Sequence, residues 1–317
     1  LVIHANDNWG PFSKSLVKSI TRRIDATNTG KGYLFTQTNS ASGYPLNYRS
    51  LKESRKQILR EKVMRMIEGG ISNAKALGLS KIFSYAGYAT PYVKEQDYHA
   101  ISLVPTPRAI VSEILEGQSS DQQYIENLYP GDILHLDSGR IEKAFISSDC
   151  YTDQQIKTST EKYYKQYSYL PTDYLEPEGG DGISAEEVEW FLSHFASFVL
   201  AKASEYKQKY STIYGKTFTL EIEDIQVSRT IVFGKPSPFQ DLAEGEFANK
   251  CCHVKRSSLI RSILRGDTLL ESLYTGYLGE WTRNPDDVYN SDIVMMIVMF
   301  SYYYKNVIAK DYLNKYA

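Results

Sequence analysis

Cysteine is scarce in this chain, which has only three among its 317 residues. Cys150, Cys251 and Cys252 are too few for a disulfide framework, and the adjacent pair lacks the spacing of a zinc or redox motif. We therefore expect a reducing, cytoplasmic setting. Long apolar runs are missing too, since the longest, 293–300, has eight residues and a membrane crossing needs roughly 18. No secretory signal is visible, so we expect no membrane association.

An excess of basic charge is also absent. The net charge is -2, whereas nucleic-acid binding needs clustered lysine and arginine, so nucleic acid is not an expected partner. The chain contains neither a G-x-G-x-x-G nor a Walker phosphate loop, and it has no G-x-S-x-G nucleophile elbow. The chain is therefore not expected to bind nucleotides through these loops or to act as a serine hydrolase of the nucleophile-elbow type.

Tyrosine, in contrast, is abundant. The chain has 26 tyrosines, and they are densest in two segments, 151–174 and 302–304. Tyrosine loses little rotamer entropy on binding, so such segments are typical of protein interfaces. The other interpretation is a half-buried core edge, where the ring packs and the hydroxyl reaches water. Both interpretations stay open at this point.

A strand, a helix and a second strand are predicted between Tyr33 and Tyr92. Apolar residues recur at helical spacing through 53–77, and Gly78 follows as a terminator. Short apolar runs at 33–36 and 81–85 flank this helix, which is the pattern of a right-handed crossover between parallel strands. The loops that follow, 38–44 and 85–92, should then leave the same edge of a sheet, where ligands bind in layered α/β folds.

The C-terminal part reads as a separate α+β region. Ser184 and Glu187 form a capping box before a helix with an apolar stripe. The segment 217–225 then alternates between apolar and polar residues, as a half-buried strand does, and further strands are expected at 229–233 and 250–254. We expect domains at 1–150 and 184–317, joined by a tyrosine-rich connector at 151–183.

Potential metal ligands follow the first predicted strand. His4, Asn6, Asp7 and Asn8 come directly after the apolar start, and His99 lies just beyond the loop 85–92. Imidazole and carboxylate are ligands that zinc and iron favour in hydrolytic and oxygen-activating sites. An aspartate after a strand can also cap a turn, so Asp7 is either a ligand or a capping residue.

Several segments carry a family resemblance. The sequences NSASGYPLNY, FSYAGYATPY, VPTPRAIVSEI and YPGDILHLDSG, and a closing stretch from SSLIRSILRGD to NPDDVYN, follow in this order. They resemble the C-terminal half of metallo-β-lactamase-fold proteins of the CMP-N-acetylneuraminate hydroxylase and UlaG-like branch. The resemblance implies an αββα sandwich around a metal site. A fainter similarity, of 253–274 to sterol-carrier-type domains, would imply an apolar ligand.

The resemblance implies one ligand directly, because Asp7 matches the family's metal-bridging aspartate. The family's H-x-H-x-D-H histidines do not occur here. Since the first residue is not methionine, we expect an N-terminal half with these histidines to precede Leu1. A lineage that has lost its metal is the other explanation.

Together these observations predict a metal-dependent enzyme, either a hydrolase or an oxygen-dependent hydroxylase, that acts on a small molecule. Asp7 would be the catalytic residue and, with His4 and His99, would bind zinc or iron. Asn6, Asn8, Tyr85 and Tyr88 would line the substrate pocket. The alternative is a metal-free scaffold of the same fold, in which the tyrosine-rich segment and the C-terminal helix bind a protein partner or a second copy of the chain.

Overall fold

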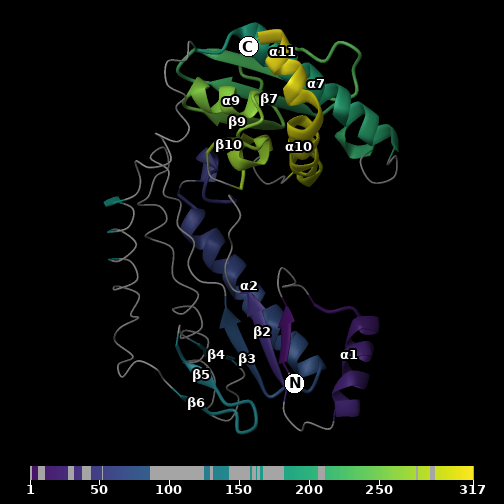
Figure 1. Ribbon diagram of the computed structural model, residues 1–317, viewed down its shortest axis with the longest axis vertical. Coiled ribbons are helices and arrows are strands. Elements are labelled where there is room, and N and C mark those ends of the chain that lie inside the picture. Colours follow the sequence, from purple (N-terminus) through teal and green to yellow (C-terminus); the bar gives the residue numbers. More distant parts are fainter. Residues whose placement is uncertain are drawn as a thin grey trace. The chain divides into compact units, whose positions relative to one another are not determined.

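The chain forms two compact units (Figure 1). The computed structural model describes residues 2–5, 11–27, 32–37, 44–51, 53–85, 125–128, 131–142, 158, 162, 165–166, 182–205, 211–275, 278–285 and 290–316. The first unit takes its described residues from 2–37, 53–85 and 125–162, and the second takes them from 44–51 and 165–316. The protein is therefore a mixed α/β protein in which a short early segment belongs to the later unit.

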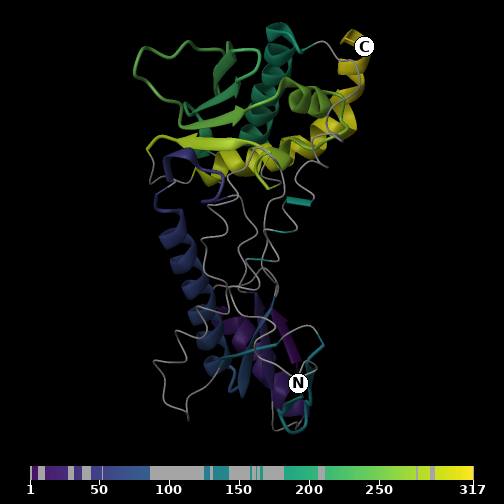
Figure 2. The ribbon, with the colours of Figure 1, turned by 90° about the vertical axis from the view of Figure 1, so that its left-hand side faces the viewer.

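The first unit is built on a parallel sheet of four strands in the order β1-β2-β3-β4. These strands are β1 (Val2–Ala5), β2 (Tyr33–Gln37), β3 (Lys81–Tyr85) and β4 (Ile125–Asn127). Helix α1 (Lys14–Thr27) connects β1 to β2, and the long helix α2 (Arg55–Ala76) connects β2 to β3 (Figure 2). The predicted strand-helix-strand unit is confirmed, and Gly78, with φ +64°, follows α2 as predicted.

Both helices pack on the same face of this sheet. Leu34 pairs with Ile3 and Ile82 across three strands, and this row joins one apolar cluster with Val63, Ile67 and Ala74 of α2 and with partly buried residues of α1. Right-handed crossovers between strands in sequential order place their helices on one side. Gly70 allows α2 to approach closely, since a Cβ there would lie 2.9 Å from the methyl group of Thr36.

Aromatic residues occupy the opposite face. His4, Phe35 and Phe83 pair across β1, β2 and β3, and the rings of Phe35 and Phe83 lie 5.3 Å apart between centroids. The hairpin β5 (Ile133–Leu134) and β6 (Ile141–Glu142) belongs to this unit, and the Tyr33 hydroxyl donates a hydrogen bond to the carbonyl of Leu136 beside it.

The second unit contains a mixed sheet in the order β10-β9-β7-β8. Its strands are β7 (Thr217–Ile222), β8 (Val227–Val232), β9 (Lys250–Val254) and β10 (Glu280–Arg283). β7 pairs with β9 in parallel, whereas the other two pairings are antiparallel. The α-helices in the described part of this unit are α7 (Ala185–Glu205), α9 (Ser257–Leu264), α10 (Ser291–Tyr303) and α11 (Ala309–Tyr316), with a π-helical turn at Tyr304–Ile308.

One face of the mixed sheet packs against these helices. Phe218, Leu220 and Ile222 of β7 are buried, as their alternation predicts, and they share one core with Phe195 of α7 and Phe300 of α10. The capping box at the start of α7 is confirmed, since the Ser184 hydroxyl accepts a hydrogen bond from the backbone N–H of Glu187 and the Glu187 carboxylate accepts one from the N–H of Ser184.

The structure tests the predicted fold class, domain boundaries and absence of membrane helices only in part. The observed architecture is a mixed α/β protein with a parallel sheet and a mixed sheet, while the αββα sandwich stays a proposal. The predicted connector 151–183 lies mostly outside the described residues, so the predicted domain boundaries stay predictions. Among the described residues, no helix combines the length and the hydropathy that a membrane crossing requires.

Candidate functional site

The carboxyl ends of β1, β2 and β3 lie side by side. Ala5 closes β1 and pairs with Thr36, and Gln37 closes β2 and pairs with Tyr85, which closes β3. The loops predicted to carry the active site therefore begin at one common edge of the parallel sheet. This is the edge at which ligands bind in parallel α/β sheets.

The structure describes few of the predicted site residues. His4 is exposed on β1, on the face opposite the helices, and its ring stacks with Phe35 at 6.3 Å between centroids. Tyr85 closes β3, but its side chain is outside the described part. Five residues lie outside the described residues altogether, namely Asn6, Asp7, Asn8, Tyr88 and His99. Their assignment to the site stays a prediction.

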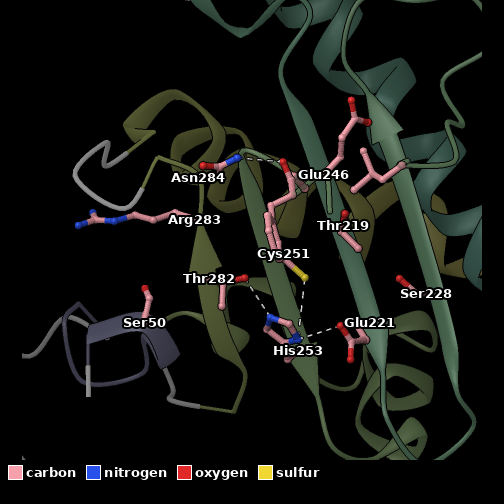
Figure 3. A pocket seen from close by; sticks show the side chains of 13 residues that line it. Ser50, Thr219, Glu221, Ser228, Glu246, Cys251, His253, Thr282, Arg283 and Asn284 are labelled. Carbon is pink, nitrogen blue, oxygen red and sulfur yellow. Dashed lines mark hydrogen bonds and ion pairs between the residues drawn. The ribbon is translucent and has the colours of Figure 1, made fainter. Parts of the chain in front are cut away.

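A second candidate site lies in the second unit, on the face of the mixed sheet opposite its core. Glu221 of β7 pairs in register with His253 of β9, and Cys251 pairs with Thr282 of β10. Residues two apart on a strand point to the same side, so Cys251 and His253 share one face. Cys252, between them, is fully buried on the core side. Figure 3 shows Glu221, Cys251, His253 and Thr282 projecting together from the sheet.

Hydrogen bonds hold the imidazole of His253 between two strands. Its Nδ1 lies 3.0 Å from Oε2 of Glu221 and 4.0 Å from Sγ of Cys251, and its Nε2 lies 3.0 Å from the Thr282 hydroxyl (Figure 3). The side chain of His253 is 11% exposed and that of Glu221 is 40% exposed. The ring is therefore nearly buried, while the carboxylate remains accessible.

Glu221 differs from Glu223 and Glu280, the other acidic residues of this face, in its ion-pair partner. Arg49 pairs with both Glu223 and Glu280. Hydrogen bonds to these carboxylates outweigh the effect of burial, so the pKa of Arg49 lies above its ordinary value. Within the described part of the chain, Glu221 has an ion pair only with His253 and none with a lysine or arginine.

Burial keeps both neighbours of Glu221 neutral. Burial, followed by the repulsion of Glu221, raises the pKa of the Cys251 thiol to about 12. Burial and the positive charge of Arg49 lower the pKa of His253 despite the opposing influence of Glu221. At neutral pH the Cys251 thiol therefore keeps its proton and the His253 imidazole is uncharged.

A pocket of about 560 Å³ adjoins this group, and Glu221, Cys251 and His253 are among its lining residues. Leu242, Phe247 and Ala248, from the segment between β8 and β9, contribute apolar lining. Such a volume falls within the range of small-molecule sites. The donor atoms of the three residues all lie within 4.8 Å of one another, so Glu221, Cys251 and His253 could hold a metal ion.

Glu221, Cys251 and His253 are not among the site residues predicted from the sequence. Cys251 and Cys252 lack the spacing of a known motif, and the informative spacing is that of Cys251 and His253, two residues apart on one strand face. Alternation along 217–222 also predicts that Glu221 lies on the polar face. What the sequence lacks is the register that sets β7 beside β9.

Comparisons with known proteins gave no relatives. No family model matches the chain, and neither the curated proteins nor the solved structures include a significant match.

Proposed function

We propose that the chain is part of a metal-dependent enzyme of the metallo-β-lactamase type, a hydrolase or an oxygen-dependent hydroxylase, that acts on a small molecule. The observation that carries the proposal is the common edge at which β1, β2 and β3 end. From this edge the chain continues directly from Ala5 into Asn6, Asp7 and Asn8. Polar side chains from several loops converge at such an edge in parallel sheets.

The two faces of the parallel sheet support the sandwich. Helices α1 and α2 cover one face, and aromatic residues line the other, where Phe83 is buried but Phe35 is only partly buried and Val2 is 44% exposed. In an αββα sandwich each sheet carries helices outside and packs its inner face on a second sheet. One half of such a sandwich would therefore have one face covered by helices and one apolar face, as this sheet does.

The ligand set is incomplete within these 317 residues, because the H-x-H-x-D-H pattern does not occur. Asp7 is the proposed bridging ligand, with His4 and His99 as further candidates, and the missing histidines would come from outside this sequence. A bound zinc or iron ion would supply an activated water or oxygen chemistry. Asp7 would hold the ion, and Asn6, Asn8, Tyr85 and Tyr88 would orient the substrate by hydrogen bonds.

Metal analysis of the purified protein tests this proposal. The comparison uses Asp7→Ala and, as the matched control, Asp25→Ala, which removes an exposed carboxylate from α1. Both are made in a Cys251→Ser background, so that the group of the second unit does not contribute. We expect Asp7→Ala to lower the bound metal by one ion per chain and Asp25→Ala to leave it unchanged. Equal metal content in the two variants would remove Asp7 from the site.

The second candidate is a metal-free scaffold that binds a protein partner. Exposed apolar side chains near the C-terminus favour it: Tyr302, Tyr303 and Val307 are 50%, 42% and 50% exposed. Sedimentation of the wild type and of Tyr302→Ser/Val307→Ser tests self-association. A wild type that stays monomeric at all concentrations would contradict the homo-oligomer form of this candidate.

A further inference from the structure

Glu221, Cys251 and His253 offer three chemically different donors on one face of the mixed sheet. Thiolate sulfur and imidazole nitrogen select against magnesium and calcium, which prefer oxygen ligands. Zinc accepts sulfur, nitrogen and carboxylate oxygen together, and three protein ligands with one open position are typical of catalytic zinc. We propose that these residues form a zinc site, separate from the one at the edge of the parallel sheet, whose fourth coordination position opens into the adjoining pocket.

The separations of the donor atoms suit zinc. Bonds of about 2.0–2.3 Å in a tetrahedron place ligand atoms about 3.3–3.6 Å apart. The distance from Nδ1 of His253 is 3.0 Å to Oε2 of Glu221 and 4.0 Å to Sγ of Cys251, and all three donors lie within 4.8 Å. The first distance is shorter and the second is longer than in a zinc site, so binding of the ion requires small rotations of both the Glu221 and the Cys251 side chains.

Thr282 orients the imidazole for this role. Its hydroxyl lies 3.0 Å from Nε2 of His253, on the side of the ring away from Glu221 and Cys251. A metal at Nδ1 requires the proton to be on Nε2, which then donates to the Thr282 oxygen. Metal-bound histidines ordinarily make such a hydrogen bond with the second ring nitrogen, and its loss weakens metal affinity about 10- to 100-fold.

The charges also balance. When zinc binds, the Cys251 thiol releases its proton to water. The resulting thiolate and the Glu221 carboxylate together carry two negative charges, which neutralise Zn²⁺, so the occupied site has no net charge. Arg49 lies in ion pairs with Glu223 and Glu280, which leaves the Glu221 carboxylate to the metal. Because all three ligands line the pocket, an ion among them faces its interior, where water or a small anion completes the tetrahedron.

Cobalt(II) binding to the full chain tests this site. A cobalt thiolate gives a charge-transfer band in the near ultraviolet, and tetrahedral cobalt gives intense visible bands. We expect one equivalent of Co²⁺ to produce both in the wild type and in Asp7→Ala, and Zn²⁺ to displace it. Cys251→Ser should abolish the charge-transfer band, while Cys252→Ala, which removes the neighbouring thiol on the core side, should retain it. A band that survives Cys251→Ser, or no band in the wild type, would overturn the proposal.

A second pair of variants keeps all three ligands. Thr282→Val should weaken Zn²⁺ affinity about 10- to 100-fold. Thr230→Val removes a hydroxyl from the same sheet face, where Thr230 contacts Thr219 and not His253, and should leave the affinity unchanged. Equal affinities in the two variants would show that Thr282 does not orient a ligand. Added azide should shift the visible bands of the cobalt form, and bands insensitive to azide would contradict an open position.

Discussion

The two sheets of this protein differ most on the faces that their helices leave uncovered. The parallel sheet presents Phe35 and Phe83 there, whereas the mixed sheet presents Glu221, Cys251 and His253. An apolar face gains stability from a further packed layer, while a polar face is stable beside water or a ligand. The difference indicates that the face opposite the helices is suited to packing in the first sheet and to binding in the second.

The largest expected effect concerns packing on the aromatic face. Phe83 is fully buried between Tyr33 and Phe35, with ring centroids 5.9 Å and 5.3 Å away. Phe83→Ala should lower the free energy of unfolding of the first unit by about 3–5 kcal/mol. Denaturant unfolding of the full chain, with separate transitions fitted for the two units, measures this loss. The matched variant Thr219→Ala, on the polar face of the mixed sheet, should cost far less, and equal losses would remove the contrast between the faces.

The next largest effect is on the pH dependence of stability, and it comes from Lys250 on the helix-covered face of the mixed sheet. Lys250 is fully buried, its Nζ lies 2.6 Å from the Tyr48 hydroxyl, and the rings of Tyr48, Tyr274 and Trp281 surround it. Burial, followed by the charge of Arg283, lowers its pKa to about 7. The unfolded chain therefore binds the proton more tightly than the folded one, and stability rises with pH above about 7.

Lys250→Met removes this titration. The free energy of unfolding of the wild type, relative to this variant, should rise by about 2 kcal/mol between about pH 7 and about pH 9. Denaturant unfolding of both proteins at each pH provides the measurement, and groups common to both cancel in the difference. A difference that does not change with pH would mean that the aromatic rings keep the lysine at its ordinary pKa.

The smallest expected effect compares the long helices of the two units. The Ser184 hydroxyl caps α7, whereas Ser54 before α2 makes no capping hydrogen bond through its side chain. Ser184→Ala should lower the free energy of unfolding by about 1 kcal/mol. Ser54→Ala should cost less, as judged from the separate unfolding transitions. The reverse order would show that capping does not distinguish the two helices.

Local patterns predicted many elements well. The strand 250–254 and the apolar stripe of α7 follow from spacing that neighbouring residues carry themselves. The structure also places 44–51 in the second unit, where Tyr48 forms a bridge with Trp281 and Arg49 pairs with Glu223. These partners are far apart in the sequence, and no local pattern records such contacts.

The sequence alone determined which residues of each strand share a face, because the backbone of a strand alternates sides at every residue. It therefore already placed Cys251 and His253 together, and Glu221 on the polar side of its own strand. Only the tertiary structure decided that β7 and β9 are neighbours in a register that brings the carboxylate to the imidazole. Strand pairing depends on the packing of the whole core, and a shift of one residue would have turned Glu221 away.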